Sequence, residues 1–318
     1  MPRTGGAKSA VAIGTFDGVH RGHQRILASL REVARRDNLE SVAYAFVLPP
    51  SLTLRGKARG LLLPEEAKIR LLERYVDRVE RVRFADVSGI APDVFVREVL
   101  LRRLGAWAIV VGQGFRFGRD RAGDLSLLRA ICEKESVALV AVPPLVVDGS
   151  AVSSTRIRQL ISEGRVEDAA VFLGRPPLLV GQVVHGDRLG RELGHPTANL
   201  SIDARILLPR DGIYLVRAFW NGGQSPGLLY IGTRPTVNGT DRRCEVHLFA
   251  EGSIASPDSP VRSENLYGKI LEAHLLRRVR DDRSFPSLVE LKSQMERDVE
   301  RARVLFAASD WPEEPIVT

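Results

Sequence analysis

One short stretch constrains the fold of this chain more than any other. Residues 11–24 begin as an apolar strand, turn at Gly14 and Gly18, and continue into a helix with apolar residues at helical spacing. His20 and His23 lie three residues apart in the expected first turn of that helix. A helix N-terminus attracts anions, and imidazoles can donate hydrogen bonds to phosphate oxygens. Either histidine alone would indicate only a surface residue on an ordinary turn, but the whole pattern Gly-x-Phe-Asp-Gly-x-His-x-Gly-His favours a phosphate site.

Composition narrows the classes of protein. At 318 residues the chain is long enough for two domains, and its hydrophobic content of 44% indicates folded cores. The net charge of +7 permits nucleic acid, acidic membranes or anionic small molecules as partners. Lys and Arg form no dense run interleaved with aromatic residues, so we expect no nucleic acid partner. With no apolar signal core, and no apolar run near the roughly twenty residues that cross a bilayer, we expect a cytoplasmic protein without membrane contact.

The first half alternates strands with helices, which predicts an α/β fold with a doubly wound parallel sheet. The expected strands are 11–13, 41–47, 81–84, 108–111 and 138–142, and helices are expected after each of the first four. Two short helices follow, and Gly174-Arg175-Pro176-Pro177 then ends helical structure. We place the domain boundary there, with a first domain of residues 1–173 and a second of residues 174–318.

Two further stretches fall where such a sheet binds ligands. The segment 112–118 follows the strand 108–111, and ligands lie at the carboxyl ends of parallel strands. Its Phe115 and Phe117 either contact a flavin or adenine ring or pack inward as part of a structural loop. In the second stretch, three hydroxyl residues precede a helix, and Ser153 or Ser154 is a natural N-cap. Arg158 lies one turn further along and can point back toward the same anion.

Beyond the boundary the pattern changes to short strands. They are expected at 179–184, 213–220, 228–231, 244–249 and 269–276, followed by a long amphipathic helix at 288–305. Several short strands at close spacing predict a β-barrel, and the helix is expected to cover it. In the stretch 185–200, Thr197 and Asn199 alternate, so an extended chain presents both side chains on one face. Their oxygens suit Mg²⁺, although Asn199 bonding its own backbone explains the spacing as simply.

The first of these stretches, 14–23, resembles the nucleotidyltransferase signature of the bacterial bifunctional riboflavin kinase/FAD synthetase family. The resemblance implies that the paired histidines hold ATP phosphates during adenylyl transfer. It also extends to Ser-Ser-Thr-x-x-Arg at 153–158 and to Val-Val-Gly-x-x-Phe-Arg-Phe-Gly at 110–118. The residues that it assigns to ATP in the first half are Gly14, Phe16, Asp17, His20, His23, Ser154, Thr155 and Arg158. Those assigned to the flavin there are Gly112, Phe115 and Phe117.

The second half carries the riboflavin kinase signature Gly-x-Pro-Thr-Ala-Asn at residues 194–199. The resemblance implies that Thr197 and Asn199 coordinate Mg²⁺ and the ATP phosphates, and that Arg280 belongs to the flavin site. Glu245 matches the catalytic glutamate, a base that would accept the proton of the ribityl hydroxyl. Without the resemblance, an exposed carboxylate paired with Arg242 or Arg243 is the simpler interpretation of Glu245.

The chain departs from the family pattern in four places. Gly114 stands where many members carry Asp or Asn, and His195 stands where Phe is usual. Pro49-Pro50 occupies the position of a common Pro-His-Pro, and residues 251–263 are longer than the usual connection and are read as a mobile insertion near the kinase site.

The resemblance predicts a bifunctional enzyme that uses Mg²⁺. It would convert riboflavin and ATP to FMN, and then FMN and ATP to FAD with release of pyrophosphate. The departures keep open a monofunctional riboflavin kinase with a degenerate adenylyltransferase domain. A regulator that senses flavin or nucleotide and binds nucleic acid through its basic surface is an alternative of another class.

Overall fold

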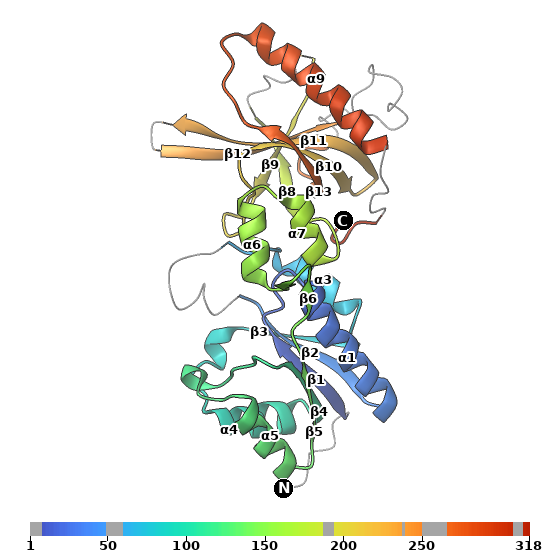
Figure 1. Cartoon of the computed structure of the whole chain (residues 1–318), viewed down its shortest axis with the longest axis vertical. Helices are drawn as coiled ribbons and strands as arrows, with labels where there is room; N and C mark the ends of the chain where they lie inside the picture. Colours follow the sequence, from blue (N-terminus) through green and yellow to red (C-terminus); the bar gives the residue numbers. More distant parts are fainter. Residues whose placement is uncertain (1–7, 49–59, 187–193, 237–238, 250–265, 308–313) are drawn as a thin grey trace. The chain divides into compact units, whose positions relative to one another are not determined.

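The computed structural model describes residues 8–48, 60–186, 194–236, 239–249, 266–307 and 314–318 (Figure 1). The side chains of 234–236 and 239–241 are outside this description. The chain forms two compact units, one made of residues 1–59 and 65–154 and the other of residues 60–64 and 155–318. No helix in the described part of the chain is long and apolar enough to cross a membrane.

The first unit is built on a five-stranded sheet in which all neighbouring strands run parallel, as the sequence predicted. The strand order is β3-β2-β1-β4-β5. The strands are β1 (Ser9–Gly14), β2 (Glu40–Phe46), β3 (Arg78–Val82), β4 (Ala106–Gly112) and β5 (Ala138–Val142). The strand order reverses between β1 and β4, so the loops after these two strands emerge at the position where doubly wound sheets bind ligands.

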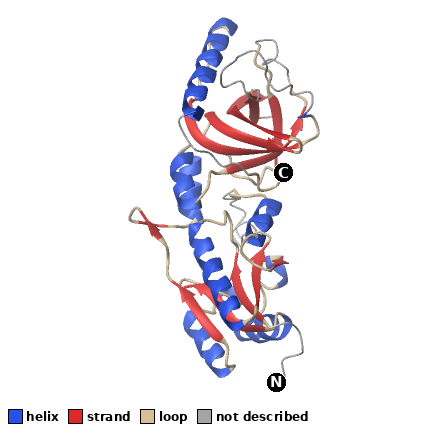
Figure 2. Cartoon of the chain, turned by 90° about the vertical axis from the view of Figure 1, so that its right-hand side faces the viewer, coloured by secondary structure: helices blue, strands red, loops and turns tan. Residues whose placement is uncertain are grey.

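Helices cover both faces of this sheet (Figures 1 and 2). On one face Val11 and Ile13 of β1 join a core cluster with residues of the π-helical segment Phe95–Arg103 and of α5. Helix α1 buries Leu27 and Leu30 against the sheet and contacts β1, β2, β4 and β5. The helical elements are α1 (Arg21–Asp37), α3 (Glu65–Glu73), η1 (Phe84–Asp86), α4 (Pro92–Val94), η2 (Phe95–Arg103), η3 (Arg119–Arg121) and α5 (Leu125–Lys134), and a hairpin of β6 (Val146–Val147) and β7 (Ser150–Ala151) follows β5.

The second unit contains a closed six-stranded barrel of antiparallel strands in the order β10-β11-β12-β9-β8-β13. The strands are β8 (Leu178–Val184), β9 (Ala198–Ile202), β10 (Gly212–Trp220), β11 (Gly223–Thr236), β12 (Gly239–Leu248) and β13 (Ile270–Asp281). Helix α9 (Leu288–Ala307) buries Val299 and Ala302 in a cluster with Leu215, Leu228 and Phe249 of the barrel. The barrel and its covering helix are therefore as the sequence predicted.

Helices α6 (Ser154–Ser162) and α7 (Val166–Leu173) precede the barrel in the sequence. All of α6 beyond its first residue, and all of α7, belong to the compact unit of the barrel, and α7 contacts β13. The domain boundary at residue 173 stays a prediction.

Candidate functional site

The loop after β1 is held in a conformation that its sequence makes unusual. Phe16, Gly18 and Val19 all have positive φ angles, of 51°, 84° and 40°. The N–H of Val19 donates to the carbonyl of Phe16 at 2.9 Å, which closes a tight turn. The Phe16 ring is buried over Gly14, where an added Cβ would lie 3.1 Å from the ring. Positive φ angles at two bulky residues are costly, and such local strain is typical of functional loops.

The turn delivers His20 and His23 to the start of α1. His20 is the N-cap residue, and its Nδ1 accepts the backbone N–H of His23 at 3.3 Å. An Nδ1 that accepts carries no proton, so the remaining ring proton of a neutral His20 lies on Nε2. Phe16 packs edge-on against the His23 ring, with centroids 5.4 Å apart. Burial, with the charges of His20 and Lys68, holds the pKa of His23 well below its usual value. Its Nδ1 is buried and finds no hydrogen-bond partner among the described residues.

Lys68 is a buried cation that the sequence analysis missed. It lies on α3, is only 4% exposed, and its Nζ donates to the carbonyls of Phe46 and Val47 at 2.6 and 2.9 Å. Those carbonyls mark the end of β2, and Gly14 of β1 pairs with Ala45, so Lys68 lies at the same sheet edge as the histidine loop. Burial lowers the pKa of Lys68, and the charge of the buried Asp17 opposes this shift.

The hydroxyl residues Ser154 and Thr155 form the start of α6 itself, and they divide between the two units. Ser154 belongs to the first unit, where its Oγ donates to the carbonyl of Asp17 at 3.0 Å and so contacts the predicted phosphate loop. Thr155 and Arg158 belong to the second unit, and the Nε of Arg158 donates to the carbonyl of Gly60 at 3.0 Å. The expected approach of Arg158 to the two histidines stays a prediction.

In the second unit the predicted kinase residues come together. Asn199 on β9 is the register partner of Glu245 on β12 and of Val184 on β8. The hydroxyl of Thr197 donates to Oε2 of Glu245 at 3.1 Å. Gly186 lies directly against the Asn199 amide, because a Cβ there would be 2.0 Å from its Nδ2. The hydroxyl, amide and carboxylate thus face one small region of the barrel.

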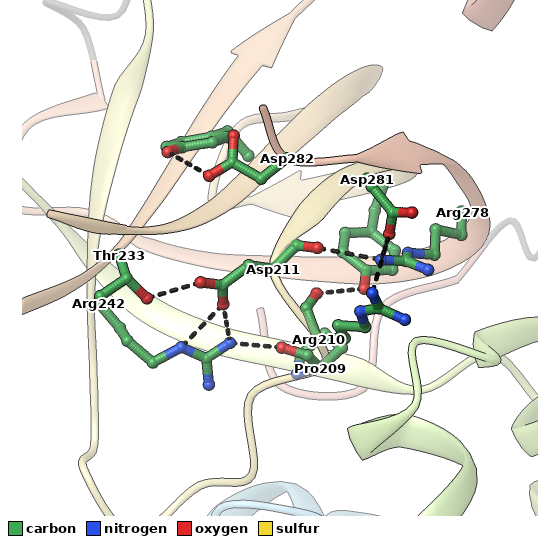
Figure 3. A network of polar contacts seen from close by, with 10 residues as sticks. Pro209, Arg210, Asp211, Thr233, Arg242, Arg278, Asp281 and Asp282 are labelled. Atoms are coloured by element: carbon green, nitrogen blue, oxygen red, sulfur yellow. Dashed lines mark hydrogen bonds and ion pairs between the residues drawn. The ribbon is translucent and has the colours of Figure 1, made fainter. Parts of the chain in front are cut away.

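Arg242, an expected alternative partner of Glu245, is engaged elsewhere (Figure 3). Its guanidinium donates to the carboxylate of Asp211 and to the carbonyl of Pro209. Asp211 also accepts the hydroxyl of Thr233, the register partner of Arg242, at 2.6 Å. This network ties the start of β10 to β11 and β12, three residues from Glu245 along β12.

Comparisons with known proteins agree with both halves of this arrangement. Residues 4–156 match the family model described as FAD synthetase, and residues 173–306 match the one described as riboflavin kinase. The bifunctional riboflavin kinase/FMN adenylyltransferase of Escherichia coli K12 is 36% identical over 93% of this chain and 92% of its own length. That of Haemophilus influenzae is 34% identical over 93% and 94%.

This chain belongs to the bifunctional riboflavin kinase/FMN adenylyltransferase family. A solved structure described as a macrolide-efflux protein from Streptococcus pneumoniae is also similar, with a TM-score of 0.83, 30% identity, and coverage of 93% of this chain and 94% of its own. The presence of both domains, in a chain that aligns with bifunctional relatives almost end to end, favours the bifunctional interpretation over a monofunctional kinase.

Two of the family's flavin positions in the first unit differ in exposure. Phe117 is 6% exposed and belongs to the core beside Phe95, whereas Phe115 is half-buried and stacks on Phe117 with centroids 5.4 Å apart. Gly112 ends β4, and Gly114 is exposed, with open space where a Cβ would lie. An Asp or Asn side chain would therefore fit at 114. The flavin roles of Gly112, Phe115 and Phe117 stay predictions.

Arg280, the flavin position of the second unit, has a clear structural partner. Its Nε donates to both carboxylate oxygens of Asp298 on α9, at 3.0 and 2.8 Å, and both side chains are largely buried. The guanidinium also donates to the carbonyl of Asp281. These bonds fasten the covering helix to β13, and a contact of Arg280 with flavin stays a prediction.

A second residue that the sequence analysis missed is His247, two positions after Glu245 on β12. Its Nδ1 lies 2.9 Å from the carbonyl of Pro196, the residue before Thr197. The His195 ring meets the His247 ring edge-on at 5.2 Å. The alternation of side chains along a strand could have signalled His247, because it shares a face with Glu245. Of the other departures, Pro49-Pro50 and the insertion 251–263 lie outside the described residues.

Proposed function

We propose that the first unit transfers AMP from ATP to FMN at the loop between β1 and α1. Asp17, His20 and His23, together with Gly14 and Phe16 of the same turn, would bind the ATP phosphates, and Ser154, Thr155 and Arg158 would complete the site. This assignment is supported by the helix N-terminus at His20 and by the bond from Ser154 to the loop. Gly112 and Phe115 at the end of the adjacent β4, with Phe117 beneath them, would receive the flavin.

The adenylyl transfer needs no protein nucleophile. An oxygen of the FMN phosphate forms a bond to the α-phosphorus of ATP, the bond to the bridging oxygen breaks, and pyrophosphate leaves. The protein positions the two substrates. It also places positive charges and hydrogen-bond donors where negative charge develops in the transition state. The Nε2–H of neutral His20 would be one such donor, because its Nδ1 accepts the N–H of His23 in the helix cap.

The second unit would phosphorylate riboflavin with Glu245 as the base. The proton of the ribityl hydroxyl passes to the Glu245 carboxylate. The ribityl oxygen bonds to the γ-phosphorus of ATP, and ADP leaves. In the structure Oε2 of Glu245 is occupied by the Thr197 hydroxyl. Oε1 is then the oxygen that we assign to the riboflavin hydroxyl.

The residues at this site also fit Mg²⁺. The Thr197 hydroxyl donates a hydrogen bond to Glu245, so the lone pairs of the Thr197 oxygen can face a cation. Asn199 offers an amide oxygen beside it, and hard oxygen ligands are those that Mg²⁺ prefers. Thr197 and Asn199 would hold the ion, which supplies charge neutralisation for the ATP phosphates.

The proposal is carried by the close approach of three residues: Thr197 just before β9, Asn199 on β9 and Glu245 on β12. Its test is the time course of products from riboflavin, ATP and Mg²⁺, separated by chromatography. We expect FMN to appear first and FAD to follow. Accumulation of FMN without FAD would instead support a monofunctional kinase with an inactive first unit.

We also propose that the protein acts in the cytoplasm on small molecules and binds no nucleic acid. A nucleic-acid-binding regulator would show affinity for DNA or RNA that falls steeply with salt, without turnover of flavin. Filter binding at two salt concentrations, beside the product assay, separates these alternatives.

A further inference from the structure

Asn199 lies within β9, but Thr197 lies just before it, where the backbone pairing with β12 has ended. Between β9 and β12 the register runs through Asn199–Glu245 and Ala198–Val246 and then stops. Pro196 and Thr197 lie past the last pair, and Pro196 has no N–H with which to extend the ladder. Something other than the ladder must fix this part of the chain.

Two side chains on one face of β12 take over where the ladder stops. Glu245 accepts the hydroxyl of Thr197, and His247 contacts the carbonyl of Pro196 at 2.9 Å. Residues two apart on a strand share a face, so Glu245 and His247 hold the consecutive residues Thr197 and Pro196 from the same side. A carbonyl can only accept, so the His247 Nδ1 must carry the proton of this bond.

The surroundings of His247 keep its ring in place. His195 and Phe249 pack edge-on against it, with centroids 5.2 and 5.7 Å away. Burial lowers the pKa of His247 to about 4, so the ring is neutral at physiological pH and its single proton is committed to Pro196. The ring therefore acts as a fixed donor and not as an acid or base in the reaction.

We infer that His247 is a positioning residue of the kinase site, which holds the Pro196 carbonyl so that Thr197 and Asn199 present their oxygens to the phosphates and metal. The inference rests on the proposed kinase role of the second unit. If the Pro196 carbonyl is released, Thr197 keeps only its bond to Glu245, which is the group that must also receive the riboflavin proton. Misplacement of reacting groups by about 1 Å costs on the order of 10²-fold in rate.

The test compares three replacements of His247 that differ in one property. Asn places its amide N–H near the position of Nδ1, Gln places it near that of Nε2, and Phe fills the space without a donor. For each variant, FMN formation and the KM for ATP are measured, together with FAD formation from supplied FMN in the same preparation. We expect His247→Gln and His247→Phe to lose on the order of 10–100-fold in kcat/KM for ATP, and His247→Asn to recover most of it.

FAD formation serves as the folding control, and we expect it to be retained in all three variants. A second readout is histidine NMR, in which His247 of the unaltered chain should show a proton on Nδ1 that persists from pH 8 to pH 5. Equal activity of the Gln and Asn variants, or a His247 ring protonated on Nε2 alone, would overturn the inference. Unchanged FMN formation in Glu245→Gln would instead overturn the kinase assignment itself, so the two failures are distinguishable.

Discussion

The imidazoles of His20 and His23 lie face to face, with ring centroids 3.6 Å apart and planes 15° from parallel. Two positive charges cannot share this geometry at low cost, and His23 is also close enough to Lys68 to be affected by its charge. The stack is therefore compatible with binding of an anion by neutral hydrogen-bond donors, assisted by the helix N-terminus and by the nearby buried lysine.

We predict that His23 stays neutral at pH 6. The folded pKa of His23 is lowered by burial first and then by His20 and Lys68, whereas the unfolded value is about 6.5. The unfolded chain therefore binds a proton at higher pH than the folded chain does. The stability contributed by neutral His23 is complete above about pH 6.5 and is lost as the pH falls toward the folded pKa. Histidine NMR, assigned with His23→Gln, measures this; a His23 resonance that titrates near 6.5 would contradict it.

We predict that Lys68→Met slows FAD formation and leaves FMN formation unchanged. The substitution removes the charge beside Asp17 and frees the carbonyls of Phe46 and Val47 at the sheet edge. A fall of about 10–100-fold in the rate of FAD formation is expected from the resulting misplacement of the loop. The kinase activity of the same preparation is the control. As a matched variant, Glu66→Gln removes a charge from the exposed first turn of α3 and should leave both activities unchanged. Normal FAD formation in Lys68→Met would show that the lysine is structural only.

We predict that Gly186→Ala disables the kinase site without a change of charge. A Cβ at 186 would lie 2.0 Å from Nδ2 of Asn199, so the amide must leave its place between β8 and β12. FMN formation should fall by on the order of 10²-fold, as for other small displacements of substrate-binding groups. Gly222→Ala is a poor control because its φ is positive, whereas Gly89 has open space and an ordinary φ. Gly89→Ala should therefore leave both activities intact, and equal behaviour of the two alanine variants would refute the close packing at Gly186.

We predict that Arg280 and Asp298 stabilise the barrel as a pair. Each single replacement, Arg280→Met or Asp298→Leu, leaves one largely buried charge without its partner and should cost roughly 3–5 kcal/mol in the free energy of unfolding. The double variant should cost clearly less than the sum, as urea unfolding followed by circular dichroism would measure. If Arg280 also contacts flavin, the KM for riboflavin should rise more in Arg280→Met than in Asp298→Leu. Additive losses would mean that the two side chains do not depend on each other.

The architecture could be read from the sequence because apolar periodicity dominates it. The strand 138–142 and the helix 125–134 were predicted at their observed bounds. The helix lies between Gly123-Asp124 and Glu135-Ser136, and Pro143-Pro144 ends the strand. β11 was predicted only at 228–231 but extends over Gly223–Thr236. Its ends contain Pro and Gly, which disfavour strands locally, yet they pair with β10 on one side and β12 on the other.

The sequence likewise identified some residues of the candidate sites and missed others. His20, His23, Thr197 and Asn199 stand in compact motifs, so short sequence segments identified them. Lys68 was not predicted, because a lysine in a charged helix usually points to solvent. The carbonyls that accept its hydrogen bonds lie more than twenty residues earlier in the chain. Contacts of this kind depend on which strand ends share a sheet edge, and the strand order was not predicted from the sequence.

The central claim is that two separate sites carry the two reactions, and one paired measurement tests it most directly. Rates of FMN formation from riboflavin, and of FAD formation from supplied FMN, are determined for Glu245→Gln and for His23→Ala. Loss of the base should reduce FMN formation by about 10²–10⁴-fold and leave FAD formation intact. Loss of the histidine should reduce FAD formation by about 10²–10³-fold and leave FMN formation intact. A parallel fall of both activities in either variant would contradict the account.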